Sequence, residues 1–468
     1  MKLLKHPWAF LILSILITLV IKIPHLGFPF FSDETFSYYP AILEMSKKGP
    51  SMFPGAIPII LSKGHPLFFY FLASVWVRFI AGNSIILTHL FPLIISVFAL
   101  YIFHRFAKRH TNIILANLTV VLLSVQTMFL AQASLLLPEI FLFCLFILCF
   151  DAYLSENYWL YAFYGSLMML TKETGAVFIM VFEISYLVEN YKKLQTRKFW
   201  IEISLLSIPA IVYGLFLILH YLEFGVFFFS EHLGYITFER SVILYKIKSA
   251  FSTLFLKHGR NLVFYAGILS LAFLIIRKRT ITNKKLLLIC LFTLISFFIF
   301  TILNFYIYRY VFPVMGIMLL ASLVLVQQVK TKYKVLNFAY TILIISTAAY
   351  YSAIKRGQSD ADLGYTQFLP VYLEMVKYCE EQGWYDKEIG AGFNMVMGMR
   401  DQHARFLHTD KNFHMHHLPG IKDRDLIIYD STCWPYEMPQ EERDKLELIK
   451  RFEYKKHWGE IYQIKNEY

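Results

Sequence analysis

The chain has 468 residues, of which 57% are hydrophobic and only 17% are charged. A soluble domain carries about a quarter charged residues, so this composition in long uncharged runs predicts an α-helical polytopic membrane protein instead. The formal net charge is +12, a value that nucleic-acid-binding proteins share. The basic residues, however, cluster in short loops between apolar runs, which is typical of membrane-topology signals, so we expect no nucleic-acid partner.

The first apolar run, residues 8–23, predicts a span that is kept as an uncleaved anchor, because no small-residue cleavage site follows it. Lys2 and Lys5 precede this run, so we expect the N-terminus in the cytoplasm and the following loop outside. Ser32 is predicted to cap an outer surface helix over residues 33–48, which Gly49 ends. The run at 66–82 contains Arg78 and is short for a span, which favours a second outer surface helix.

Ten further spans bring the predicted total to about eleven. They cover residues 84–104, 112–131, 134–154, 158–171, 174–190, 200–221, 260–276, 285–304, 307–327 and 335–353. This arrangement places four basic loops on the cytoplasmic side, as the positive-inside rule requires. These loops lie at 105–110, 192–198, 277–285 and 330–334. We expect residues 1–354 to form one membrane domain.

The polar tail, residues 355–468, predicts a small α/β domain on the extracytoplasmic side. Helical patterns cover 367–381 and 440–450, and strand-like runs cover 387–393 and 425–429. Cys379 and Cys433 lie in this tail and could pair if it is extracytoplasmic, although their spacing does not show that they meet. No Cys/His spacing resembles a zinc site.

With this topology, the outer ends of the spans share an unusual set of polar residues: Asp33, Glu34, Lys63, His65, Glu139, Lys172, Glu231, His232, Arg309 and Tyr310. Each has a simpler explanation. The carboxylates would favour a helix N-terminus, and the long cations would reach the interface by snorkelling. Lys172 and Arg309 nevertheless run against the positive-inside bias. The functional interpretation therefore depends on the whole set meeting on one face.

Carboxylates and cations at an outer membrane face suit sugar transfer from a polyprenyl phosphate. A phosphate leaves with charge, which Lys172 and Arg309, with Lys63 or His65, would stabilise. An acceptor hydroxyl is a weak nucleophile that needs a general base, and Asp33 is our candidate. We expect Glu34, about 100° away on the same helix, to orient the loop or contact the acceptor. Direct attack would invert the anomeric carbon.

At these residues a family resemblance emerges. Asp33-Glu34 with Tyr38, followed by Lys63-Gly64-His65-Pro66-Leu67, resembles the first outer loop of GT-C glycosyltransferases, in the branch of protein O-mannosyltransferases and lipid A aminoarabinose transferases. The chain also resembles later motifs of that branch at Leu170-Thr171-Lys172, at Phe229-Ser230-Glu231-His232 and at residues 308–313. The resemblance implies a GT-C fold over about residues 1–350, a polyprenyl-phosphate-sugar donor and Asp33 as the base. The tail lacks the sugar-binding repeats of eukaryotic mannosyltransferases, which favours the bacterial branch and its cytoplasmic membrane.

The sequence also departs from the family pattern. The usual double proline is replaced by His65-Pro66-Leu67, and Glu139 lies beyond the place where the family has an aspartate. Some members pair an acidic residue with the later histidine for a metal, but Gly64 stands in that region, so we expect no required cofactor and leave a metal near His232 in doubt. The acceptor stays open among lipid A, protein and another glycan. Two rival classes remain, a transporter or flippase of lipid-linked sugars and a non-catalytic membrane assembly protein.

Overall fold

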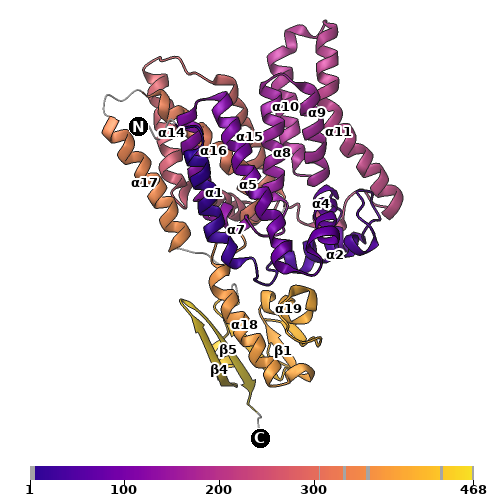
Figure 1. Cartoon of the computed structure of the whole chain (residues 1–468). Helices are drawn as coiled ribbons and strands as arrows, with labels where there is room; N and C mark the ends of the chain where they lie inside the picture. The colour runs from indigo at the N-terminus through magenta and orange to yellow at the C-terminus, as the bar shows by residue number, and fades with distance from the viewer. Residues whose placement is uncertain (1–5, 305, 330–333, 355–358, 433–435, 466–468) are drawn as a thin grey trace.

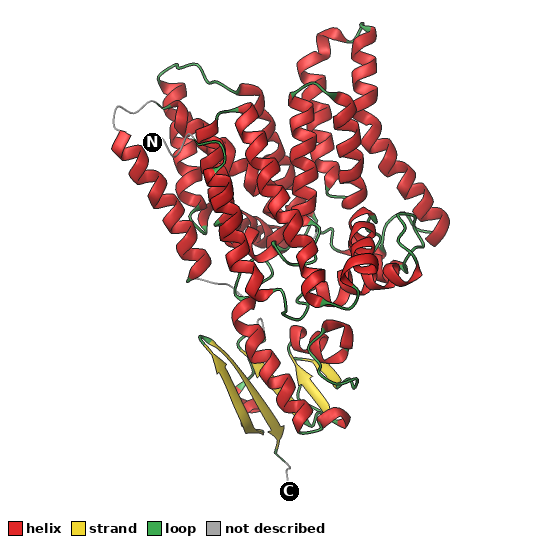
Figure 2. Cartoon of the chain, in the orientation of Figure 1, coloured by secondary structure: helices red, strands yellow, loops and turns green. Residues whose placement is uncertain are grey.

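The computed structural model of the chain describes residues 6–304, 306–329, 334–354, 359–432 and 436–465. A bundle of helices forms the larger part, and a small domain with a sheet lies at one end of it (Figure 1). Nearly all of the bundle is helical, and every described strand belongs to the small domain (Figure 2). The N-terminus and the small domain lie at opposite ends of the bundle (Figure 1).

Helices occupy all eleven of the predicted spans. They are α1 (Ala9–Lys22), α5 (Ile85–His110), α6 (Ile113–Ser124) with α7 (Thr127–Gln132), α8 (Glu139–Leu154), α9 (Tyr158–Thr171), α10 (Gly175–Asn190), α11 (Arg197–Phe224), α14 (Arg260–Ile276), α15 (Lys284–Leu303), α16 (Phe312–Gln328) and α17 (Lys334–Ala353). Among the described helices, α5, α11, α15 and the run Tyr308–Gln328 are long and apolar enough to cross a membrane. The chain is therefore a multi-pass helical membrane protein, and the count of about eleven crossings stays a prediction.

Two neighbouring spans depart from their predicted form. The predicted helix at 112–131 is broken into α6 and α7, and the next begins at Glu139 instead of residue 134 because Pro138 cannot continue a helix from the preceding segment. Side chains satisfy backbone groups both at the end of α7 and in the segment between α7 and α8. Glu34 accepts a hydrogen bond from the Leu136 amide at 2.5 Å, and Lys22 donates to the Ala131 carbonyl at 3.2 Å.

Both predicted surface helices are present at the end of the bundle that faces the small domain (Figure 1). The first comprises a π-helical turn, η3 (Glu34–Tyr38), and α2 (Tyr39–Lys48), and ends at Gly49 with φ of 124°. The second comprises α4 (Phe68–Trp76) and η4 (Val77–Ala81). The cap predicted at Ser32 is wrong, because Ser32 has φ of 56° and its hydroxyl donates to Asp360 instead.

The segment between α11 and α14 holds helices that the sequence did not predict. They are α12 (Ser230–Gly234), α13 (Arg240–Phe251) and the π-helical turn η6 (Ser252–Leu256). The α13–η6 run meets α14 at 84°, a bent pair that could count as one further broken span. Smaller helical turns complete the membrane part: η2 (Ile23–His25), α3 (Ile59–Ser62), η5 (Tyr191–Lys193) and η7 (Tyr308–Val311).

The helix ends that carry the basic loops at 105–110, 192–198 and 277–285 meet at the end of the bundle opposite the small domain, whereas the loop at 330–334 lies almost entirely outside the described residues. Asn283 donates to the His110 carbonyl at 2.6 Å, and Lys285 pairs with Glu189 at 2.8 Å. Asn112 donates to Gln327 at 2.8 Å, which joins α6 to the end of α16. The bundle therefore has one basic end and one end that carries the small domain. Which side is cytoplasmic stays a prediction.

The small domain is a five-stranded sheet in the order β2-β1-β3-β5-β4. Its strands are β1 (Glu388–Ala391), β2 (His414–His417), β3 (Leu426–Asp430), β4 (Leu446–Tyr454) and β5 (His457–Ile464). β1 runs parallel to both β2 and β3, whereas β5 is antiparallel to β3 and β4. The helices are α18 (Tyr365–Glu381), α19 (Phe393–Arg400) and α20 (Gln440–Arg443), with short turns at η8 (Trp384–Asp386) and η9 (Gln402–Ala404).

The predicted helix at 440–450 is wrong beyond Arg443, because β4 begins at Leu446 and pairs with β5 along its length. Cross-strand pairing outweighed the helical pattern there. The helix predicted at 367–381 and the strands predicted at 387–393 and 425–429 are present with shifted ends. Cys379 is buried on α18, and Cys433 lies outside the described residues, so their pairing stays a prediction.

Candidate active site

Five charged side chains meet at the junction of the two parts, and we call them the Arg309 cluster: Asp33, Glu139, Lys172, Arg309 and Asp360. They come from five separate places in the chain. Asp33 precedes η3, Glu139 begins α8, Lys172 follows α9, Arg309 lies in η7, and Asp360 lies between α17 and α18. The cluster thus joins four of the residues that the sequence singled out with one, Asp360, that it did not.

Arg309 is the centre of this cluster. Its Nε donates to Glu139 at 3.1 Å, and its two terminal nitrogens pair with Asp33 and Asp360. The side chain of Arg309 is only 2% exposed, whereas that of Asp33 is 25% exposed. A planar guanidinium holds its partners in a fixed geometry. Arg309 therefore fixes the position of Asp33 and leaves one edge of that carboxylate open.

Lys172 completes the charge balance inside the cluster. Its Nζ donates to Glu139 at 3.0 Å and lies 4.0 Å from the centre of the Tyr310 ring. Both Lys172 and Glu139 are buried. Burial raises the pKa of Asp360. Attraction by Arg309 lowers it, and repulsion by Asp33 raises it further. Two cations thus face three carboxylates, and burial makes Asp360 readier to hold a proton than an exposed aspartate.

A second group lies beside the cluster and contains His65, Glu173 and His232. His65 Nδ1 lies 2.9 Å from Glu173 Oε2, and the rings of His65 and His232 are 4.9 Å apart. Burial would raise the pKa of Glu173, but the neighbouring His65 lowers it to about 2. Burial and the proximity of His65 lower the pKa of His232 to about 4. No group of three or more His, Cys, Asp or Glu side chains in the described ranges could hold a metal ion.

The remaining candidates have different surroundings. Glu34 is fully buried, accepts from the Phe31 and Leu136 amides and lies 3.4 Å from His89, so it orders the loop and does not join the cluster. Tyr38 is buried and stacks on Tyr70, with ring centres 5.4 Å apart. Lys63 Nζ lies 4.5 Å from the centre of the Phe36 ring. Glu231 is exposed on α12.

Two adjoining cavities open beside Arg309, between the bundle and the small domain. The first, which we call the junction cavity, has a volume of about 800 Å³ and contains Asp33, Arg309 and Asp360 in its wall. The second, of about 940 Å³, contains Lys257, Arg260 and Lys456, and we call it the basic cavity. Tyr308, Ser359, Asn394 and Thr432 line both cavities, so the two are neighbours.

The cations of the basic cavity were missed by the sequence analysis. Arg260 is buried, and its nitrogens donate to the Thr253 carbonyl and to Gln126, both neutral groups. Lys257 is exposed, and so is Lys456, which comes from the turn between β4 and β5. A charged residue at the start of α14 was a signal that the sequence offered. Nothing local in the sequence brings Lys456 to the same place.

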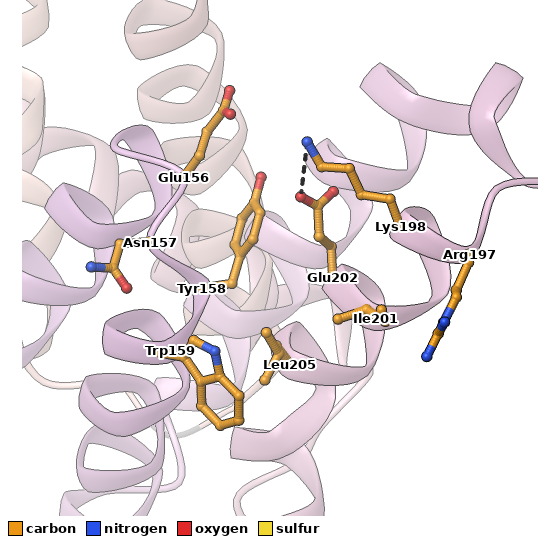
Figure 3. A pocket seen from close by; sticks show the side chains of 9 residues that line it. All are labelled: Glu156, Asn157, Tyr158, Trp159, Arg197, Lys198, Ile201, Glu202 and Leu205. Atoms are coloured by element: carbon orange, nitrogen blue, oxygen red, sulfur yellow. Dashed lines mark ion pairs between the residues drawn. The ribbon is translucent and has the colours of Figure 1, made fainter.

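Another hollow, of about 690 Å³, lies at the basic end of the bundle, lined by residues of the α9 and α11 N-termini (Figure 3). Lys198 pairs there with Glu202 at 3.7 Å, with its side chain 77% exposed. Tyr158 begins α9, whose other end precedes Lys172. A helix of that length separates its ends by about 20 Å, so this hollow is remote from the Arg309 cluster.

The helical bundle with surface helices and a small sheet domain has the fold of GT-C membrane proteins, as the motifs around Asp33 predicted. Two solved structures share it. The chain is similar to ArnT from Cupriavidus metallidurans in the apo state, at 13% identity and a TM-score of 0.52, over 80% of this chain and 70% of that one. It is also similar to the same protein bound to undecaprenyl phosphate, at 11% identity and a TM-score of 0.56, over 98% of both chains. No protein-family profile and no curated protein sequence matches the chain.

Proposed function

We propose that the protein is an inverting glycosyltransferase that moves a monosaccharide from a polyprenyl-phosphate donor to an acceptor on the extracytoplasmic face of a bacterial cytoplasmic membrane. The observation that carries this proposal is Asp33, a part-exposed carboxylate that Arg309 holds at the wall of the junction cavity. The fold supports it, because a protein with the same fold was crystallised with undecaprenyl phosphate.

In the proposed reaction Asp33 removes the proton from an acceptor hydroxyl. The acceptor oxygen forms a bond to the anomeric carbon while the bond from that carbon to the phosphate oxygen breaks, and the phosphate keeps the electron pair. Asp33 acts as a general base, so it must lie within hydrogen-bond reach of the acceptor. Its exposed edge and its fixed position meet that need.

The leaving phosphate needs positive charge near it. We predicted Lys63, His65, Lys172 and Arg309 for this role, and it stays a prediction. Arg309 directs all three of its nitrogens at carboxylates, and Lys172 shares Glu139 with it. Lys257, Arg260 and Lys456 place three cations on the adjoining basic cavity, against one carboxylate, Asp362, among the described residues of its wall. We therefore add these three to the candidates for phosphate binding.

The two rival classes fit the site less well. A transporter places polar groups near the middle of the bilayer and commonly shows repeated halves, whereas the Arg309 cluster lies at one end and the sequence shows no repeat. An assembly protein needs no carboxylate fixed at a cavity wall. Domain limits of 1–354 for the membrane domain and 355–468 for the extracytoplasmic domain are part of this proposal. Asp360 then belongs by sequence to the second domain and by contact to the first.

Native mass spectrometry of the detergent-purified protein tests the donor. We expect undecaprenyl phosphate to bind at least tenfold more tightly than undecaprenol, because only the phosphate meets the cations. Surface glycans and glycoproteins from cells with and without the gene, compared by mass spectrometry, test the transfer. Equal binding of the two lipids together with unchanged surface glycans would overturn the proposed function.

A further inference from the structure

The roof of the junction cavity is built by the small domain. It consists of the segments that follow β1, β2 and β3: Gly392, Phe393 and Asn394 after β1, His417 with Leu418 and Pro419 at the end of β2, and Thr432 after β3. These three strands are parallel, so their carboxyl ends lie at one edge of the sheet. Ligands of open α/β sheets bind in the crevice outside such carboxyl ends.

The crevice faces the Arg309 cluster directly. Asp33, Arg309 and Asp360 line the same cavity from the membrane side. Contacts between the two parts fix this arrangement, because the Phe36 and Phe393 rings pack edge to face at 5.3 Å and the Phe30 amide donates to the Ala404 carbonyl at 3.1 Å. A molecule held in the crevice therefore lies next to Asp33.

The crevice presents an aromatic face and polar groups. Phe393 is 48% exposed, and its ring stacks on that of His417 at 5.8 Å and 15°. Asn394 and His417 line the junction cavity with polar side-chain atoms that can form hydrogen bonds to a ligand. Burial and the nearby Arg400 and His416 lower the pKa of His417, which favours a neutral ring at neutral pH. Apolar faces with a few polar groups are typical of a small-ligand site.

We propose that this crevice is the acceptor-binding half of the active site and that the acceptor group it holds is an uncharged saccharide. This inference rests on the proposed function, because an acceptor site requires a transfer reaction. A sugar ring offers an apolar face for Phe393 and hydroxyl groups for Asn394 and His417. One of its hydroxyls would then be the nucleophile that Asp33 deprotonates.

Two other acceptors fit the crevice less well. A phosphorylated acceptor needs an available cation, and Arg309, the one arginine or lysine among the described residues of the wall, is occupied by three carboxylates. An extended peptide binds sheets by adding to an edge strand. The crevice centres on β1, which has β2 on one side and β3 on the other, and the sheet edges are β2 and β4.

Saturation-transfer NMR on the full-length protein in lipid nanodiscs tests this assignment. The probes are maltotriose, mannotriose and galactotriose, a phosphorylated maltotriose and a Ser/Thr-rich peptide. We expect at least one neutral trisaccharide to bind more tightly than the phosphorylated one and the peptide. Phe393→Leu keeps an apolar contact with Phe36 but removes the aromatic face, and His417→Leu, at a residue that lines the junction cavity and not the basic cavity, removes the imidazole. Each should weaken saccharide binding at least fivefold.

Tyr454→Leu is the matched control, because Tyr454 is an exposed aromatic residue on β4, away from the crevice. It should leave saccharide binding unchanged. Undecaprenyl phosphate binding, measured on the same samples, should be equal in all four proteins and shows that each is folded. The inference would be overturned if the phosphorylated sugar or the peptide bound more tightly than every neutral trisaccharide. It would also be overturned if no neutral trisaccharide bound, or if neither crevice variant weakened the binding. A wild-type protein that does not bind undecaprenyl phosphate would instead count against the proposed function.

Discussion

The two ends of the helical bundle differ in how deeply their ion pairs are buried. At the end next to the small domain, Lys172 and Arg309 have side chains only 3% and 2% exposed and share the buried Glu139. At the basic end, Arg109 pairs with Asp151 at 3.0 Å but is 51% exposed, and Lys285 and Glu189 are each more than one-third exposed. Ion pairs thus occur at both ends, and among the described residues the most deeply buried ones lie at the end next to the small domain.

The difference has an energetic meaning. An exposed ion pair contributes roughly 0–1 kcal/mol. Burial of an ion pair carries a desolvation cost that the attraction within the pair often fails to offset, so a buried network is weak support for stability. Buried charges at a membrane are kept where a function needs them. For the Arg309 cluster this comparison favours the proposed reaction over folding stability, whereas the basic end needs only the predicted topology signals.

Chemical labelling gives the largest contrast between the ends. A cysteine that replaces Asn283, at the basic end, should resist a membrane-impermeant thiol reagent in intact cells. A cysteine that replaces Gln440, on the exposed surface of the small domain, should react, with both signals read above the wild-type background. The expectation follows from the positive-inside rule. The reverse pattern would place Asp33 on the cytoplasmic side and contradict the proposed reaction.

The next contrast is catalytic and concerns Asp33. Asp33→Asn keeps the size of the side chain but cannot accept a proton, so sugar transfer should fall by roughly 10²–10⁴-fold, the range for a lost general base. Glycan transfer in cells that carry the variant gene, normalised to protein in the membrane, measures this loss. Asp386→Asn, an exposed position in the small domain, is the control and should transfer at the wild-type rate. Near-wild-type transfer by Asp33→Asn would exclude Asp33 as the base.

The contrast in stability compares two arginines. Arg309→Met leaves three carboxylates crowded without their shared cation, which should destabilise the folded protein by about 3–5 kcal/mol. Arg109→Met removes an exposed partner of Asp151 and should cost less than ~1 kcal/mol. Unfolding in mixed micelles with increasing SDS measures both. Equal losses would show that burial does not distinguish the two ends.

The sequence predicted the site in part because the relevant residues contradict local rules. Lys172 and Arg309 stood out as cations on the outer side, and both lie in the cluster. Asp360 was missed because it follows the last span in a polar stretch, where an aspartate is unremarkable. Only tertiary packing brings it to Arg309.

The fold shows the same division. Apolar runs long enough for a span located eleven helical segments, and Gly49 correctly ended the first surface helix. The break between α6 and α7 was not visible, because residues 112–131 read as one apolar run and the backbone at the break is satisfied by distant side chains such as Ser352, which donates to the Val125 carbonyl. Likewise, the sequence at 440–450 has a helical pattern, and only the pairing of β4 with β5 shows that its second half is a strand. Long-range contacts decided these cases, and a single sequence does not contain them.

The smallest expected effect is at Glu173, which lies beside the Arg309 cluster. Its side chain is 33% exposed, a value between those of the buried cluster and the exposed ion pairs of the basic end. Burial would raise its pKa, but His65 lowers it from the ordinary 4.5 to about 2. A carboxyl whose folded pKa is lowered stabilises the fold above its unfolded pKa and loses that contribution as the pH falls toward 2. Wild type should thus exceed Glu173→Gln in stability by ~1 kcal/mol or less at pH 7, since partial exposure screens the pair. Thermal unfolding from pH 7 to pH 2 should show this gap shrink below pH 4.5, whereas Glu381→Gln, in an exposed pair with Lys377, should show no gap. A gap that stays constant with pH would mean that Glu173 contributes by packing and not by its charge.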